Sequence, residues 1–235
     1  MISPLLILLL MKSRAWSLER VVRHLIWVYG RGWLLLIQPW VRFERCGLSG
    51  EEIPRPCVYV INHLSFFDTY FMAALPDSDV AFAVRSWPFR MFWYRLFMRG
   101  AGYLEVENQS WAETIKQGCA VLRQGGCVLF FPEGHRSRNG ELQRFYSGAF
   151  QLAIAARVPV VPLCITGTDR LLPPGRHYLK PARVRLRVLP AISSEPFQQE
   201  GGARLLRISV KGQMAEALRE MKGDGAEQKQ DSLSP

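Results

Sequence analysis

Short apolar runs alternate along the chain with longer segments in which apolar residues recur every three to four positions. The apolar runs are typical of β-strands and occupy residues 57–61, 80–84, 103–106, 127–131, 158–165 and 183–189. The segments between them have helical spacing and occupy residues 66–75, 88–98, 110–124 and 147–157. Strands that alternate with helices predict an α/β fold, built on a mixed, partly parallel sheet flanked by helices.

Two apolar segments precede this alternation. The first, residues 1–11, is shorter than the roughly 20 apolar residues that a bilayer span needs. The second, residues 24–41, carries Arg31 near its middle together with three tryptophans. A central arginine costs roughly 2.5–3.5 kcal/mol in hydrocarbon, whereas tryptophan favours the headgroup region. The pattern therefore favours an N-terminal membrane-interfacial helical hairpin; a hairpin buried against the main domain and a true span are the alternatives.

The 235 residues, 49% of them hydrophobic, supply enough apolar surface for a sizeable core, which excludes a mainly disordered chain. We predict three parts: the membrane-interfacial segment at 1–45, one main domain at 46–221, and a polar, disordered tail at 222–235. The formal net charge of +10 at pH 7 suits nucleic acid, an anionic membrane surface or an acidic protein as partner. Charge by itself does not choose among these.

One candidate site follows the first predicted strand. Residues 62–68 read NHLSFFD, which places a histidine and an aspartate where a strand passes into a helix, and open α/β sheets place their active sites at such strand ends. Ser65 is the expected N-cap, and Asp68 then stands in the first turn, where the helix dipole favours an ionised carboxylate. Such a carboxylate accepts the proton of one imidazole nitrogen of His63 and leaves the other as a base. A helix-capping Asp68 beside an ordinary loop histidine is the alternative.

A second candidate site follows another, very apolar strand. Residues 131–137 read FPEGHRS, so Glu133 and Arg136 flank the flexible Gly134. A carboxylate and a guanidinium at this spacing suit the hydroxyl and anionic groups of one ligand, although a local ion pair in a polar turn has the same pattern. Arg85 stands at the end of a third strand, where a surface charge is the simplest interpretation.

Several reaction classes lose support because the sequence lacks their motifs. It contains no G-x-S-x-G nucleophile elbow, no G-x-x-x-x-G-K-[ST] phosphate loop and no G-x-G-x-x-G after a strand. The four histidines lack compact metal-ligand spacing, so no metal site is predicted. What remains is a base without a protein nucleophile, which fits direct attack by a substrate hydroxyl that His63 deprotonates.

The two motifs resemble those of the glycerolipid acyltransferase family, which includes the 1-acyl-glycerol-3-phosphate acyltransferases. NHLSFFD matches the family's H-x-x-x-x-D signature, and FPEGHRS matches its F-P-E-G-T-R-S block with His135 in place of threonine. Residues 158–168 resemble the family's proline-bearing strand, and the likeness runs from about Cys57 to Ile192. The two motifs together are specific, whereas either would be weak without the other.

The resemblance implies a membrane-associated O-acyltransferase that moves an acyl chain from an acyl thioester to the hydroxyl of a lysolipid. The implied acceptor is 1-acyl-glycerol-3-phosphate, which gives phosphatidate in phospholipid biosynthesis. His63 would be the general base, and Asp68 would orient it. The residues implied in substrate binding are Arg85, Glu133, Gly134 and Arg136. No bound cofactor is implied, and acyl-CoA or an acyl carrier protein would be the co-substrate.

One departure from the family pattern bears on the acceptor. Asn108 stands where the family often has an arginine, and a neutral amide gives up a charge-assisted contact worth roughly 1.5–3 kcal/mol. A lyso-aminolipid or a specialised lipid is therefore the alternative acceptor.

An anionic membrane surface is the expected partner, because residues 89–99 mix aromatic side chains with arginines. We expect a monotopic or peripheral protein on the cytoplasmic face of the cell (inner) membrane. Arg183, Arg185 and Arg187 share one face of a strand and either dock an acidic carrier protein or remain solvated. The non-enzymatic alternatives are a catalytically silent lipid-binding protein and a basic nucleic-acid-binding protein. Dispersed charges and the apolar N-terminus argue against nucleic acid.

Overall fold

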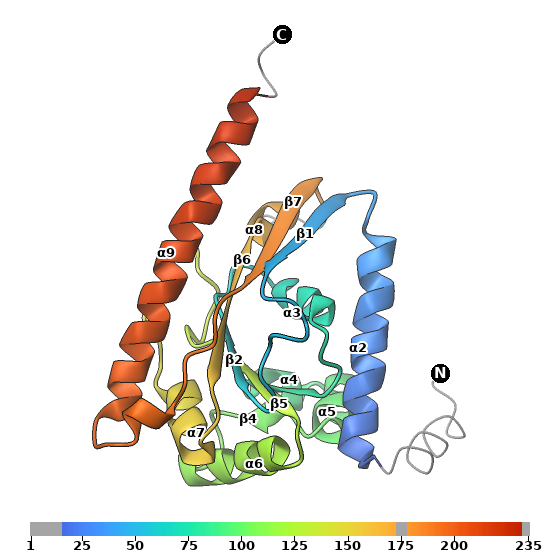
Figure 1. The fold of residues 1–235 in the computed structure, drawn as a ribbon. Coiled ribbons are helices and arrows are strands. Elements are labelled where there is room, and N and C mark those ends of the chain that lie inside the picture. The colour runs from blue at the N-terminus through green and yellow to red at the C-terminus, as the bar shows by residue number, and fades with distance from the viewer. Residues whose placement is uncertain (1–15, 173–177, 232–235) are drawn as a thin grey trace.

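The computed structural model describes residues 16–172 and 178–231, which form a layered α/β fold (Figure 1). Seven strands of this part of the chain form one sheet in the order β1-β7-β6-β2-β5-β3-β4. Their bounds are β1 Val41–Gly47, β2 Val58–Ile61, β3 Val80–Val84, β4 Leu104–Glu105, β5 Cys127–Phe130, β6 Val160–Thr166 and β7 Ala182–Val188. Strands β2 to β6 run parallel, whereas β7 is antiparallel to β6 and β1 is parallel to β7. The prediction of a mixed, partly parallel sheet is confirmed.

Helices cover both faces of this sheet. The α-helices are α2 Leu18–Leu36, α3 Asp68–Phe71, α4 Trp87–Arg90, α5 Phe92–Gly100, α6 Trp111–Arg123, α7 Gly148–Ala156, α8 Thr168–Leu171 and α9 Gly202–Asp231, and Met72–Ala74 and Glu195–Phe197 are short 3₁₀ helices. Helices α6, α7 and α9 pack on one face, while α2, α3 and α8 pack on the other (Figure 1). Strand β2 contributes Val58 and Val60 to the first core and Tyr59 and Ile61 to the second, as the alternation along a strand requires.

Only the second half of the predicted N-terminal hairpin lies within the described residues. Its first apolar segment, residues 1–11, lies outside the described residues. The second forms the single helix α2, in which the Ser17 hydroxyl oxygen accepts from the Arg20 N–H at 3.3 Å, as an N-cap does. Residues 41–45 belong instead to β1, which pairs along its whole length with β7. Strand β1 therefore crosses the predicted domain boundary at residue 45.

A buried ion pair holds α2 against the domain. The Arg23 guanidinium lies 2.6 Å from Asp79 Oδ1 and donates to the Ala101 carbonyl oxygen at 2.9 Å. On the same helix, Trp33 stacks on Phe67 with 5.1 Å between ring centroids. One side of α2 is thus part of the packed fold. None of the described helices has both the length and the apolar content that crossing a bilayer requires.

The sequence pattern gave no prediction for α9, the longest of the described helices. Its buried residues Leu206, Val210, Met214 and Leu218 recur every four positions and complete one core of the sheet. Helix α9 continues to Asp231 and so extends into the predicted tail of residues 222–235.

Candidate active site

The two sequence motifs meet at one edge of the sheet. Strand β5 lies between β2 and β3, with Phe130 in register with both Val60 and Ala83. The loops that leave these parallel strands carry the motifs, at the edge where open α/β sheets place their ligand sites. A hydrogen bond joins the loops directly, because the His63 N–H donates to Glu133 Oε1 at 2.9 Å.

His63 and Asp68 form a close pair, as the sequence predicts. The imidazole Nδ1 lies 2.7 Å from Asp68 Oδ2. The aspartate is fully buried, whereas the histidine side chain remains 18% exposed. The ring also packs on Phe131, with 4.3 Å between the ring centroids. Since Nδ1 donates its proton to the carboxylate, Nε2 is the nitrogen with a lone pair, which is the arrangement of a general base.

Three further groups hold the Asp68 carboxylate in place. Its Oδ2 accepts from the backbone N–H groups of Leu64 (2.7 Å) and Ser65 (2.8 Å), and its Oδ1 accepts from the Thr168 hydroxyl at 2.5 Å. Helix α3 begins at Asp68, with Phe67 at its N-cap, so the prediction of Ser65 as N-cap is not met. Ser65 lies two residues before that N-cap, where its N–H donates to Asp68 and its hydroxyl accepts from the Phe67 N–H at 3.4 Å. Asp68 therefore makes three hydrogen bonds that hold the loop and the helix start in place, in addition to its contact with His63.

The sequence prediction gave no role to Asn62, which fixes the start of the His63 loop. Its side-chain amide donates to the Ile165 carbonyl oxygen at 2.9 Å and accepts from the Ile165 N–H at 2.8 Å. These bonds continue the pairing of β2 with β6 one step past the last strand pair, Ile61 with Leu163. Thr168 also has no predicted role. Both residues are polar and follow a strand, which is a signal of a site, but their partners, Asp68 for Thr168 and Ile165 for Asn62, are about 100 residues away in the sequence.

Glu133 does not present its carboxylate to solvent. The residue is 1% exposed, and its two oxygens accept from the backbone N–H groups of His63 and Gln143, each at 2.9 Å. Burial raises the pKa of Glu133, while the N–H groups of Gln143 and His63 oppose that rise. The carboxylate is therefore engaged with the two loops rather than open to a ligand.

Gly134 is half-buried and Arg136 is exposed on the same loop. Gly134 has φ +70°, and a Cβ atom there would stand 2.9 Å from the Tyr146 ring, so the position requires glycine. Arg136 is exposed and has no ion pair among the described residues. The Arg136 guanidinium is thus open to an anionic ligand, and its loop is hydrogen-bonded to the loop that carries His63.

Arg85, beyond the end of β3, is already paired. Its Nε lies 2.5 Å from Glu107 Oε1, and the Arg85 side chain is 55% exposed. The Ser86 N–H, the Ser86 hydroxyl and Arg85 all donate to Glu107, and together they lower the pKa of that carboxyl, with the Ser86 N–H the largest cause. Asn108 donates to Glu105 at 2.7 Å. A ligand that uses Arg85 has to share it with Glu107.

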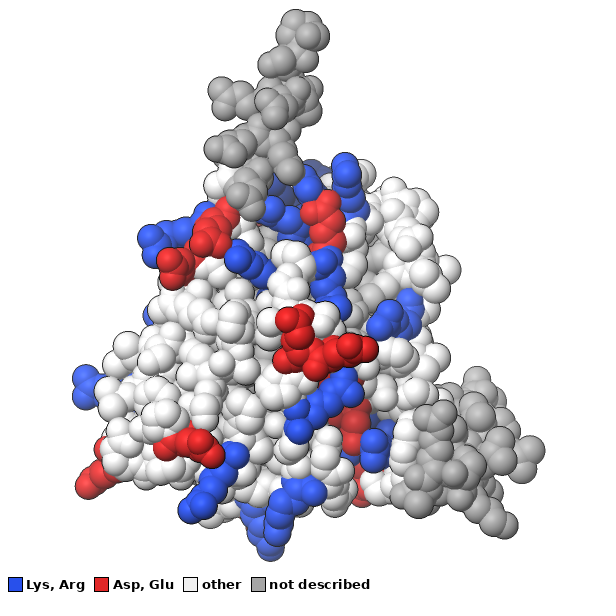
Figure 2. Space-filling view, viewed as in Figure 1, with Lys and Arg blue, Asp and Glu red and all other residues white. Residues whose placement is uncertain are grey.

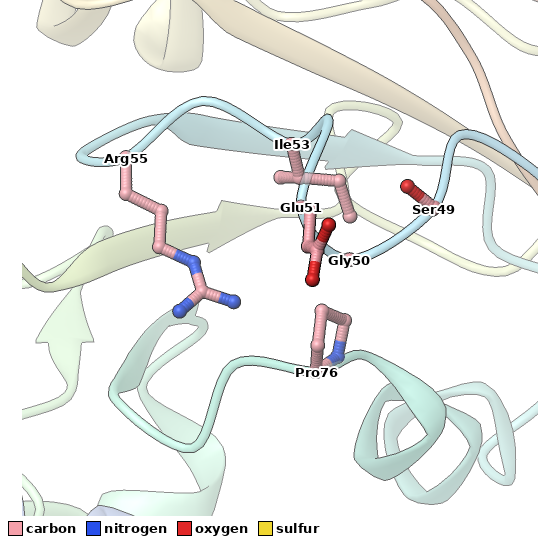
Figure 3. A pocket seen from close by; sticks show the side chains of 6 residues that line it. All are labelled: Ser49, Gly50, Glu51, Ile53, Arg55 and Pro76. Atoms are coloured by element: carbon pink, nitrogen blue, oxygen red, sulfur yellow. The ribbon is translucent and has the colours of Figure 1, made fainter.

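Other features of the described residues lie apart from this site. A cavity of about 680 Å³ is lined by Ser49, Gly50, Glu51, Ile53, Arg55 and Pro76 and contains none of the predicted site residues (Figure 3).

No described group of three His, Cys, Asp or Glu side chains is arranged to hold a metal ion. On β7, Arg183 pairs with Glu44 at 2.8 Å and Arg187 with Glu220 at 2.5 Å, so these arginines form surface ion pairs.

Comparison with known proteins identifies the class of protein that this fold and site define. The model of the family described as Acyltransferase matches residues 46–166, which is more than half of the chain. The chain belongs to this acyltransferase family. The resemblance seen in the two motifs is confirmed.

Two of the proteins to which the chain is similar are named as 1-acyl-sn-glycerol-3-phosphate acyltransferases. The chain is 35% identical to 1-acyl-sn-glycerol-3-phosphate acyltransferase BAT2, chloroplastic, from Brassica napus over 145 residues, 59% of this chain and 41% of that protein. It is 30% identical to 1-acyl-sn-glycerol-3-phosphate acyltransferase alpha from Mus musculus over 194 residues, 79% of this chain and 66% of that protein. The chain thus spans about two fifths of the Brassica relative's length.

A solved structure has the same fold. The 1-acyl-sn-glycerophosphate (LPA) acyltransferase PlsC from Thermotoga maritima superposes with a TM-score of 0.70 at 24% identity. The match covers 87% of this chain and 81% of that one, so it includes most of the sheet and its helices.

Proposed function

We propose that this protein is an O-acyltransferase that moves an acyl chain from an acyl thioester to the hydroxyl of a lysolipid. One observation carries the proposal: the 2.7 Å contact between His63 Nδ1 and the buried Asp68, which leaves Nε2 on a partly exposed ring. Membership of the acyltransferase family and the names of the relatives support the same reaction.

In the proposed reaction, His63 Nε2 takes the proton of the acceptor hydroxyl as its oxygen attacks the thioester carbonyl carbon. Asp68 stabilises the imidazolium that forms. The tetrahedral intermediate then expels the thiolate, which takes the proton back from His63, so that an ester and a free thiol leave together. The histidine returns to its starting state, and the chain itself needs neither a covalent intermediate nor a bound cofactor.

We propose 1-acyl-glycerol-3-phosphate as the acceptor, with Arg136 and Gly134 facing its phosphate. The unpaired, exposed guanidinium of Arg136 supports this assignment. Since Asn108 and the Glu107-bound Arg85 offer less positive charge than the family pattern, a lyso-aminolipid is the second candidate. Acyl-CoA or acyl carrier protein is the proposed donor. We further propose that the protein acts at the cytoplasmic face of the cell membrane.

Thiol release measured with the purified chain tests this function. We expect 1-acyl-glycerol-3-phosphate, supplied with acyl-CoA or acyl carrier protein, to release one thiol for each phosphatidate detected by mass spectrometry. Release with lyso-aminolipids and not with the phosphate acceptor would move the assignment to the second candidate. No acceptor-dependent release with either donor would refute the acyltransferase proposal and favour a silent lipid-binding protein.

We also propose that an anionic membrane binds the surface of α4, α5 and the exposed side of α2. None of the residues of α5 is buried, although the helix is rich in large apolar side chains. Phe92, Trp93 and Leu96 are 69%, 62% and 65% exposed. A contiguous exposed apolar surface of this kind is unusual in a soluble monomer and marks an interaction site. On α2, which lies beside α5 (Figure 1), the exposed apolar residues include Val28, Tyr29, Leu35 and Leu36.

Charge and position favour a membrane as the occupant of this surface. The exposed Arg90, Arg95 and Arg99 lie among the aromatic residues, and no acidic residue occurs between positions 80 and 104. Each such charge near an anionic membrane adds about 1 kcal/mol of attraction. Tyr70, two residues after the proposed orienting aspartate, lies 4.6 Å from Trp33 of α2 between ring centroids. The aromatic surface therefore continues to the helix that carries half of the proposed catalytic pair.

Cosedimentation with lipid vesicles tests the membrane proposal. The combined variant Phe92→Ser, Trp93→Ser and Leu96→Ser removes three exposed side chains, so the fold is retained while partition into phosphatidylcholine–phosphatidylglycerol vesicles falls about tenfold or more. The matched control, Leu205→Ser with Ile208→Ser, changes exposed apolar residues of α9 across the sheet and should bind like wild type (Figure 1). Unchanged partition of the triple variant would contradict the proposal. A wild-type protein that is dimeric, with a triple variant that is monomeric, would also contradict it.

The charge distribution gives little support to the nucleic-acid alternative. Over the described residues visible in Figure 2, Lys and Arg side chains are interspersed with Asp and Glu rather than gathered in one basic block. Nucleic-acid-binding surfaces cluster their basic residues along a groove or one helix face.

A further inference from the structure

Glu133 is buried, unlike the other residues predicted to bind substrate. Its Oε1 accepts from the His63 N–H and its Oε2 from the Gln143 N–H, each at 2.9 Å, and 1% of the residue is exposed. A substrate hydroxyl that used this carboxylate would have to displace a backbone hydrogen bond inside the protein. Displacement of that kind is costly, because the released N–H would be buried without an acceptor.

The two hydrogen bonds of Glu133 tie together three segments at the sheet edge. His63 follows β2, Glu133 follows β5, and Gln143 lies on the stretch that leads to α7. A third bond strengthens the link, since the Ser137 N–H donates to the His63 carbonyl oxygen at 2.7 Å. The loop after β5 thus holds the backbone of His63 at both its N–H and its carbonyl group.

We propose that Glu133 is a positioning residue, which fixes the backbone of His63 and so aims the imidazole, rather than a ligand of the acceptor lipid. This inference rests on the proposed function of the same site. A general base acts only when its nitrogen lies within hydrogen-bond reach of the acceptor hydroxyl, and a displacement of about 1 Å costs on the order of 10²-fold in rate. Asp68 fixes the rotation of the imidazole ring, and Glu133 fixes the backbone position of His63.

Glu133→Gln separates positioning from acceptor binding. Its amide keeps one acceptor oxygen and replaces the other with an NH₂ group, which cannot accept from a backbone N–H. Either His63 or Gln143 then loses its partner. We expect kcat to fall about 10- to 100-fold, while KM for 1-acyl-glycerol-3-phosphate stays within about twofold of wild type. Hydrogen exchange followed by mass spectrometry should show faster exchange of the amides of residues 62–67.

A matched control and a conservative variant sharpen this test. Glu141→Gln alters a nearby exposed carboxylate, paired with Lys222 at 2.5 Å, and should leave kcat, KM and exchange unchanged. Glu133→Asp keeps both oxygens and the charge on a shorter arm, so it should restore part of the lost kcat. If the glutamine variant does not fold, the aspartate variant supplies the same measurements.

Opposite results would overturn the inference. A Glu133→Gln variant with a higher acceptor KM and an unchanged kcat would make Glu133 an acceptor ligand. Unchanged exchange at residues 62–67 would show that the carboxylate does not hold the His63 loop. If wild-type protein releases no thiol, the proposed function fails by that result, whereas the exchange measurement still decides whether Glu133 holds His63.

Discussion

Replacing His63 with alanine is expected to lower kcat for acyl transfer by about 10²–10⁴-fold, the contribution of a positioned general base. The fold should survive, because Asp68 keeps its bonds from Leu64, Ser65 and Thr168 when the imidazole is removed. Thiol release under saturating donor and acceptor measures the loss of kcat. The melting temperature, followed by circular dichroism, reports whether the fold is intact.

His63→Asn is the matched control for this prediction. The asparagine amide reaches the place of Nδ1 and donates to Asp68, so it preserves the buried hydrogen bond while removing the basic nitrogen. A loss of the same size as in the alanine variant would show that the missing base, rather than a disturbed Asp68, is responsible. Activity of either variant within a few-fold of wild type would exclude His63 as the base.

The strands of the sheet's interior are well predicted from sequence, because their signal is local. Parallel strands buried on both faces appear as continuous apolar runs, as at β2 and β5. Strand β1 was missed because its sequence, VRFERCG, mixes charged and apolar residues, and its partner β7 lies at the other end of the chain. The period of four in α9 is an equally local signal, since its buried residues Leu206, Val210, Met214 and Leu218 lie within one segment.

In the candidate site, too, contacts within one short segment are predictable from sequence, whereas contacts between distant segments are not. The His63–Asp68 pair lies within one short segment, so spacing predicts the contact that the structure brings together. The bonds that support this pair join residues far apart in sequence: Thr168 with Asp68, and Glu133 with His63. Only the register of parallel strands brings such residues to one edge. For that reason the sequence predicts ligand binding for Glu133 and does not reveal that its carboxylate accepts from the backbone N–H groups of His63 and Gln143.

Replacing Asp68 with asparagine is expected to lower kcat by about 10²–10⁴-fold and the free energy of unfolding by about 1–3 kcal/mol. The carboxylate accepts four hydrogen bonds in a fully buried place, and an amide offers one acceptor oxygen for them. If that oxygen takes the place of Oδ2, it still accepts from His63, Leu64 and Ser65 while the NH₂ group faces Thr168, but the negative charge that stabilises the imidazolium is lost. If it faces Thr168, the NH₂ group opposes the two backbone N–H groups and His63, whose ring then loses its orientation. Thiol release and denaturant unfolding measure the two effects.

Asp169→Asn provides the control, since it makes the same chemical change beside Thr168 without touching the proposed pair. We expect wild-type kcat and unfolding midpoint from it. The two effects of Asp68→Asn have separate origins: stability depends on the Leu64, Ser65 and Thr168 bonds, whereas turnover depends on the imidazole. Thr168→Val, which removes one structural bond and leaves the 2.7 Å contact to His63, should therefore lose stability with a much smaller loss of kcat. Equal losses of kcat in the Asp68 and Thr168 variants would mean that loosening of the loop, rather than loss of an oriented base, sets the rate.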